Sequence, residues 1–144
     1  MRYTVSNIIN KPLDEVIEKF KDPEGAKEWM EGLQGYDHLS GTPGEVGAKT
    51  DFHFIHRNKE MTIQETILEQ NFPNQVKFAY QSPMGYNEVE MEFESLSDNQ
   101  VKQINHSYFE FKGAMKLFSF LFKGMMKKQS MKYLEGFKAY AEKS

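Results

Sequence analysis

Apolar and polar residues alternate through most of the chain between residues 36 and 111, and this pattern predicts β-strands. A further strand is expected at the N-terminus, over residues 1–10. The other strands are expected at 36–40, 47–56, 60–71, 75–82, 86–96 and 100–111, with short connections rich in Pro, Gly, Asn, Asp and Ser. Because consecutive strands with short connections pair as hairpins, we expect an antiparallel sheet of about seven strands.

Helical patterns occur at three places. The first helix is expected to begin at Pro12, with Asp14 and Glu15 in its first turn and Val16 and Phe20 on its apolar side. A second short helix over 24–30 contains the only tryptophan of the chain. The segment from 113 to 144 is predicted to form one long helix, because apolar residues recur at about 3.6-residue spacing. Its expected inward residues are Met115, Phe118, Phe122, Met125, Gln129, Tyr133 and Tyr140, flanked by Leu121, Met126 and Phe137.

Four large apolar residues lie off the inward stripe of this helix: Leu117, Phe120, Met131 and Leu134. Phe120 is expected almost opposite the stripe, on the side that carries several lysines. Such residues are typical of a dimer contact or a membrane-facing surface, although single exposed apolar side chains are also common.

The predicted order is a strand, two short helices, about six strands and a long helix, which is an α+β arrangement with the helices on one side of the sheet. The long helix needs an apolar surface to cover, and the sheet is the only large one. We therefore expect residues 1–144 to form a single domain in which a curved sheet and the last helix enclose a pocket.

Composition is that of a folded protein, since 39% of the residues are hydrophobic and 27% are charged. The chain has no cysteine, which excludes disulfides, thiolate metal sites and thiol nucleophiles. The N-terminus has no apolar signal core, and no run approaches the ~20 apolar residues of a membrane span. We therefore expect a cytoplasmic protein with no integral membrane association.

The charge is distributed unevenly. Residues 1–111 carry a net charge of −9, whereas residues 112–144 carry eight lysines and two glutamates, for a net charge of +6. A basic helix beside an acidic sheet explains this asymmetry, and binding to an anionic ligand or a membrane surface would also explain it.

The whole chain resembles the START-like, or SRPBCC, superfamily, which includes polyketide cyclase-like and Bet v 1-like proteins. The resemblance rests on INKPLDEV at 9–16, on Trp29-Met30 after a short Asp-Pro helix, on HLSGTPGEVG at 38–47, and on FEFKG at 109–113 before the last helix. It implies the helix-grip fold with a deep hydrophobic cavity between sheet and C-terminal helix. The superfamily includes carriers, receptors, cyclases and co-chaperone domains, so the fold does not select a function.

The alternation of the strands and the stripe of the helix select the residues expected to bind a ligand. They are Trp29, Phe52, Phe54, Met61, Ile63, Glu65, Phe78, Tyr80, Asn87, Met91, Phe93, Asn105, Phe109, Phe118, Phe122, Met125 and Gln129. For the last strand, the face with Asn105 and Phe109 is chosen as inward over the face with Ile104 and His106.

Glu65 is the candidate that is most able to take part in a reaction, because its carboxyl lies between Ile63 and Ile67 on an apolar face. A buried carboxyl is costly unless it is paired or protonated. Glu65 could therefore be a general base, pair with a Lys or His across the sheet, or face solvent if the register is shifted by one residue.

Other kinds of site are not indicated. Asp51, His53 and His56 do not share one strand face, so we expect no metal and no cofactor. No phosphate loop and no nucleophile motif occurs, and two arginines are too few to indicate nucleic-acid binding.

We expect a monomer or homodimer that binds a hydrophobic small molecule or lipid without chemistry, and we assign no catalytic residue. One alternative is a cyclase- or hydratase-type enzyme that uses Glu65 with a His or Tyr partner. Another is an interaction module that acts through the basic C-terminal helix.

Overall fold

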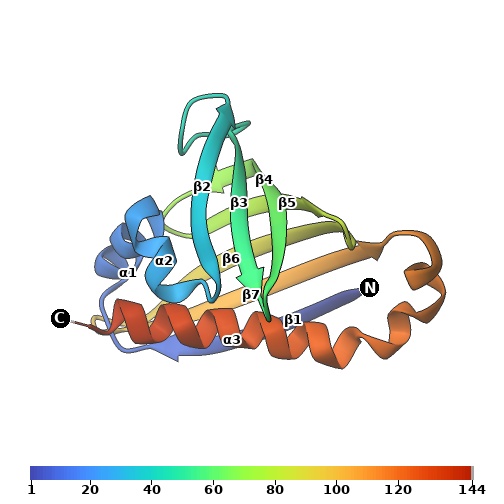
Figure 1. The fold of residues 1–144 in the computed structure, drawn as a ribbon. Helices are drawn as coiled ribbons and strands as arrows, with labels where there is room; N and C mark the ends of the chain where they lie inside the picture. The colour runs from blue at the N-terminus through green and yellow to red at the C-terminus, as the bar shows by residue number, and fades with distance from the viewer. Residues whose placement is uncertain (144) are drawn as a thin grey trace.

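Seven antiparallel strands form one curved sheet in the computed structural model, which describes residues 1–143 (Figure 1). The strands are β1 (Arg2–Ile9), β2 (Leu33–Ser40), β3 (Lys49–His56), β4 (Lys59–Asn71), β5 (Gln75–Ser82), β6 (Gly85–Ser97) and β7 (Gln100–Phe111). Their order in the sheet is β1-β7-β6-β5-β4-β3-β2, so only β1 pairs with a strand that is distant in the sequence. The predicted α+β helix-grip architecture is confirmed, although the second strand begins at Leu33 rather than at residue 36.

The helices lie on the concave side of this sheet. Between β1 and β2 come α1 (Leu13–Lys21), the short 3-10 helix η1 (Pro23–Gly25) and α2 (Ala26–Trp29), and after β7 come the 3-10 helix η2 (Gly113–Leu121) and α3 (Lys123–Ala141). The α1 helix buries Val16 and Ile17, and the acidic residues in its first turn favour its N-terminus. No helix of residues 1–143 is both long and apolar enough to cross a membrane.

The prediction of one continuous helix from residue 113 is wrong. The segment instead forms η2, then breaks at Phe122 and continues as α3, while Ser144 lies outside the described residues. Gly113 takes a left-handed conformation with φ of 59°, which turns the chain out of β7. The η2 segment lies beyond the end of the sheet (Figure 1), so no packed surface is present to stabilise α-helical geometry there.

The predicted inward face of the last helix is also partly wrong. Leu134, which was expected off the stripe, is buried, and Met131 packs against the core. Phe118 and Met125, which were expected inward, are more than half exposed. The physical reason is that α3 packs against β1 as well as against α1 and α2, and this contact turns the side of Leu134 inward.

Most of the buried apolar side chains gather at the end of the sheet that α1 covers. Phe20 lies at the centre of this cluster, with its ring 5.1 Å from that of Phe93 and 5.5 Å from that of Phe137. The Trp29 ring lies 5.1 Å from that of Phe137. Phe137 is only 1% exposed, so this end of the molecule is a densely packed core.

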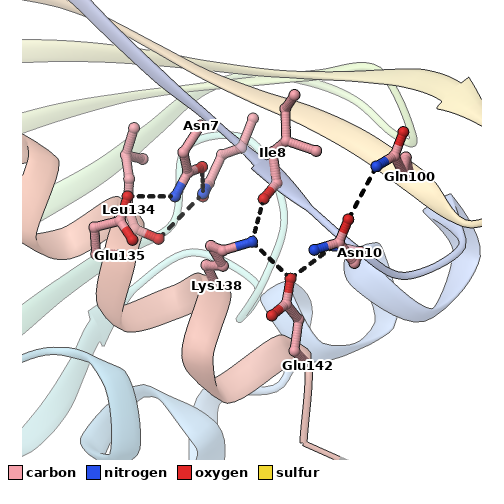
Figure 2. Close-up of polar contacts among 9 residues, drawn as sticks. Asn7, Ile8, Asn10, Gln100, Leu134, Glu135, Lys138 and Glu142 are labelled. Carbon is pink, nitrogen blue, oxygen red and sulfur yellow. Dashed lines mark hydrogen bonds and ion pairs between the residues drawn. The ribbon is translucent and has the colours of Figure 1, made fainter.

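Polar contacts fix the C-terminal half of α3 along β1 (Figure 2). Lys138 donates a hydrogen bond to the carbonyl of Ile8 at 2.5 Å and pairs with Glu142 at 2.8 Å. The Glu142 carboxylate in turn accepts a bond from the backbone N–H of Asn10 at 2.7 Å. These contacts hold the end of α3 against β1, which is an edge strand of the sheet.

The buried amide of Gln103 adds a second fixed point. It donates to the Asn7 side chain at 2.8 Å and lies 3.4 Å from the carbonyl oxygen of Leu134. Because the amide would be costly to bury without partners, these bonds favour one position of α3 over β1 and β7.

Gly136 allows the close approach of α3 to α2. A Cβ atom at this position would lie 2.8 Å from the carbonyl oxygen of Trp29, whereas a Cβ at Gly124 of the same helix would meet nothing within 4 Å.

We therefore expect opposite effects from two Gly→Ala substitutions in α3. Gly136→Ala should lower the free energy of unfolding by about 1–3 kcal/mol, because the added methyl group meets backbone that cannot yield easily. Gly124→Ala should raise it by up to about 1 kcal/mol through helix propensity. Urea denaturation of both variants measures this, and a Gly136→Ala protein as stable as the unmodified chain would contradict the close packing of α3 on α2.

Candidate functional site

Some inward-facing side chains of β3, β4 and β5 are less completely buried than those of the core near α1. Inward-facing Phe52, Ile63 and Phe78 are only half-buried, whereas Val76 and Val101, on the same face nearer α1, are 1% and 0% exposed. The register places Phe52 opposite Ile63, whereas Phe78 lies opposite Ile67, two inward positions further along β4, with its ring 6.4 Å from that of Phe20 on α1. Part of the surface of these apolar side chains therefore remains exposed on the concave face.

A carboxyl and a phenol lie together within this apolar region. Glu65 on β4 pairs with Tyr80 on β5, and the Tyr80 hydroxyl donates a hydrogen bond of 2.8 Å to the Glu65 carboxylate. Glu65 is only 9% exposed. The prediction that Glu65 faces inward is confirmed, and its partner is a tyrosine rather than a Lys or His.

Burial raises the pKa of Glu65 to about 7, and the hydrogen bond from Tyr80 opposes this rise. Burial also raises the pKa of Tyr80 well above its ordinary value, with a further contribution from the neighbouring Glu65 charge. Near neutral pH, Glu65 can therefore exist with or without its proton, while Tyr80 keeps its proton.

Further polar groups face the same interior. The Asn87 side chain, which shares the inner face with Tyr80, has a buried oxygen with no hydrogen-bond partner among the described residues. The indole N–H of Trp29 is also buried without a partner among them. Unpaired buried polar atoms are uncommon in native structures, so the Asn87 oxygen, next to the Glu65–Tyr80 pair, is a candidate partner for a ligand, whereas the Trp29 N–H lies in the packed core.

Tyr133 on α3 also belongs to this region. It contributes to the raised pKa of Tyr80, and burial raises its own pKa, an effect that the Gln129 side chain opposes. Our list of expected ligand-binding residues omits Tyr133 although it lies on the predicted helix stripe.

The residues expected to bind a ligand divide into four groups in the structure. Glu65, Tyr80 and Asn87 form the polar group, and Phe52, Met61, Ile63 and Phe78 are half-buried, with Phe52 and Ile63 at the edge of the Phe54 cluster and Phe78 at the edge of the core near α1. Asn105 and Phe109 are buried on β7, with the inward orientation that was predicted. Trp29, Met91 and Phe93 belong to the packed core near α1, and Phe54 packs with Ala26 and Leu33. From the last segment, Phe122 and Gln129 are half-buried, whereas Phe118 and Met125 are exposed and do not join the others.

Asn105 is already paired. The Ser107 hydroxyl, one position along the same face, donates a hydrogen bond of 2.6 Å to its oxygen. The rings of Phe109 and Phe111 lie 4.5 Å apart in a tilted arrangement, and the ring of Phe111 lies 5.5 Å from that of Phe122. These contacts join the end of β7 to the start of α3.

The convex face carries a separate group of possible metal ligands. Glu90, Glu92 and His106 offer donor atoms that all lie within 4.8 Å of one another, and His106 bonds Glu92 at 2.7 Å and Thr4 at 3.0 Å. Carboxylate and imidazole groups can hold a divalent ion. Sequence reasoning missed this group, because it depends on the register that sets Glu90 opposite His106. Glu90 and His106 also line a groove of about 580 Å³ on this face.

The two histidines that follow Asp51, His53 and His56, are engaged in other contacts. His53 bonds Asp37 at 2.7 Å and Thr62 at 3.1 Å, whereas His56 stacks on Phe54.

Solved structures share this fold over nearly the whole chain. A Zhui aromatase/cyclase from Streptomyces sp. R1128 superimposes with a TM-score of 0.82 at 13% identity, covering 99% of this chain and 93% of that one. For Ara h 8.0201 the TM-score is 0.77 at 11% identity, with 98% and 97% covered. The chain has the helix-grip fold that these solved structures share.

A third structure, TTHA0849 from Thermus thermophilus, has a TM-score of 0.78 at 15% identity, with 98% and 97% of the two chains covered. At these identities the similarity shows the fold and not the function. No family model matches the sequence, and no curated protein matches it.

The buried Glu65 carboxyl predicts a pH-dependent stability. Between about pH 4.5 and pH 7, the folded protein keeps a proton on Glu65 that the unfolded chain releases, so this residue lowers stability as pH rises. Glu65→Gln removes the ionisable carboxyl and with it this loss of stability at higher pH. The variant should gain up to about 3 kcal/mol over the unmodified protein at pH 8 and almost nothing at pH 4.

Urea denaturation at several pH values measures this difference, and carbon-13 NMR of the Glu65 carboxyl measures its pKa directly. Tyr80→Phe is the matched test of the hydrogen bond. Without the Tyr80 hydroxyl, the pKa of Glu65 should rise further. A Glu65 that titrates near pH 4.5 would show that the carboxyl is solvated.

Proposed function

We propose that this chain binds a hydrophobic small molecule or lipid on the concave face, between β3–β5 and the N-terminal half of α3. The observation that carries the proposal is the combination of accessible apolar side chains with a buried carboxyl–phenol pair. Phe52, Met61, Ile63 and Phe78 supply apolar surface, and Glu65 with Tyr80 supplies polar groups within it. A concave, mostly apolar site with few polar groups is the usual form of a small-molecule site.

The polar groups favour a ligand that is neutral or cationic and carries a hydrogen-bond donor. The Glu65 carboxylate and the unpaired oxygen of Asn87 both accept hydrogen bonds, and a hydroxyl, amide or amine could donate to either. An anionic group would lie beside the Glu65 charge in an apolar environment, where like charges repel strongly. We therefore expect weaker binding of carboxylates above pH 7 than below it.

A second candidate function is acid–base catalysis, for which Glu65 and Tyr80 are the specific support. A carboxyl whose pKa lies near 7 can take up and release a proton at neutral pH, and a neutral tyrosine can donate a hydrogen bond to a developing oxyanion. One structure of the same fold is an aromatase/cyclase. Ring closure and loss of water from a poly-β-ketone need such proton transfers.

The binding proposal predicts saturable binding of the neutral fluorophore N-phenyl-1-naphthylamine to the folded protein, with one molecule per chain. Ile63→Trp should weaken binding at least about 10-fold, because the larger side chain fills the accessible concave face. Thr62→Trp is the matched control, since Thr62 is exposed on the opposite face of the same strand, and it should leave the affinity unchanged. Fluorescence titration of the three proteins measures this, and equal affinities would place the probe elsewhere.

Glu65→Gln separates the two candidate functions. In a binding protein, the variant should keep its affinity for the neutral fluorophore and show no pH dependence of carboxylate binding. In an enzyme, the same variant should still bind a poly-β-keto thioester analogue but no longer convert it, as mass spectrometry would show by the absence of the product that has lost water. If the unmodified protein does not convert the analogue, the proposal of acid–base catalysis loses its support.

A further inference from the structure

Large apolar side chains stand exposed in and just after η2. Leu117 and Phe120 are 75% and 74% exposed, Leu121 is 63% exposed, and Phe118 and Met125 are each 53% exposed. We call these five residues the η2 surface. None of the nine residues of η2 is buried, so the segment makes little use of its apolar side chains within the molecule.

This grouping differs from the other large exposed apolar residues. Ile8, Leu39, Ile55 and Leu96 are each less exposed than any member of the η2 surface, and they lie singly on β1, β2, β3 and β6. Val46, which is 58% exposed, lies in the connection between β2 and β3. Scattered residues of that kind are normal on a soluble protein. A continuous group such as the η2 surface is typical of an interaction site.

Lysines flank the η2 surface on both sides. Lys112, Lys116, Lys123, Lys127 and Lys128 are all exposed, and none of them forms an ion pair with a described residue. No Asp or Glu occurs from residue 112 to residue 134. The remainder of the molecule is acidic, so this positive charge is confined to one region.

The η2 segment contacts β7 and α3 and lies apart from α1 and α2 (Figure 1). Figure 1 shows η2 projecting from the end of the sheet that lies away from α1 and α2. It can therefore meet a flat surface without obstruction from those helices.

We propose that the η2 surface docks onto an anionic lipid bilayer, with the apolar side chains inserted among the headgroups and the lysines against the lipid phosphates. Apolar insertion and charge attraction are the two contributions that together hold peripheral proteins on membranes. A second copy of this chain fits less well, because a symmetric contact would set five lysines against five. The inference goes beyond ligand binding and does not depend on it.

Co-sedimentation with vesicles tests the proposal. The protein should bind vesicles of phosphatidylcholine with about one-third phosphatidylglycerol at least about 10-fold more tightly than pure phosphatidylcholine vesicles, and added salt should weaken this binding. The double variant Leu117→Gln/Phe120→Gln should lose most of it. Leu39→Gln/Leu96→Gln, which changes two exposed apolar residues on β2 and β6, should keep it.

Separate variants test the contribution of the lysine charges and the depth to which the η2 surface enters the bilayer. Lys116→Gln/Lys123→Gln should reduce the preference for anionic vesicles, whereas Lys27→Gln/Lys59→Gln, which removes two exposed lysines from other elements, should not. In a Phe120→Trp variant, brominated acyl chains should quench the fluorescence of the new tryptophan much more than that of the native Trp29.

Three results would overturn the proposal. The first is equal binding to both kinds of vesicle, and the second is full binding by Leu117→Gln/Phe120→Gln. The third is that light scattering shows a dimer of the unmodified protein but not of this variant, while neither protein binds vesicles. The last result would assign the surface to a second copy of the chain.

Discussion

The packing of the C-terminal half of α3 against β1 and the α1–α2 segment determines which part of the interior is solid and which is accessible. Phe137 is enclosed by Phe20 and Trp29, and Lys138 bonds the backbone of β1. Beyond Gln129, toward the N-terminus of the helix, such contacts become sparse, and Met125 is more than half exposed. The helix is therefore held less tightly toward its N-terminal end, where the contact of Phe122 with Phe111 joins it to β7.

The ionised Glu65 carboxyl lowers the stability of the folded protein, and the fold alone does not explain why a carboxyl stands at this position. A carboxyl in an apolar interior destabilises the folded state whenever it is ionised, and one hydrogen bond from Tyr80 offsets this cost only in part. A glutamine or a leucine would serve a purely structural role at lower cost. Residues that lower stability in this way are common at functional sites, because function there requires a charge or a proton that packing does not. The same reasoning applies to the exposed apolar residues of η2, which contribute little to the core.

Much of the sheet could be predicted from the sequence, because a strand with one buried face alternates strictly and any one-residue shift would expose its apolar set. Ile63, Glu65, Phe78, Tyr80 and Asn105 face inward for this reason. The last segment could not be predicted equally well. Between residues 115 and 126 apolar side chains occur on nearly every side, so periodicity does not fix which side is inward or where α-helix gives way to 3-10 helix. Leu134 was misplaced because its burial depends on α1, α2 and β1, whose positions the local pattern does not contain. The pairing of Glu65 with Tyr80 and the grouping of Glu90 with His106 required the register between strands.

The most direct test of the ligand site is to locate a bound molecule by NMR. Protein labelled at the methyl groups of Ile and Met, mixed with N-phenyl-1-naphthylamine, should give intermolecular nuclear Overhauser effects between the probe and the methyl groups of Met61 and Ile63. Met91, which is 5% exposed in the packed core, should give none. Contacts confined to Met115 and Met125, with none to Met61 or Ile63, would contradict a site on the concave face.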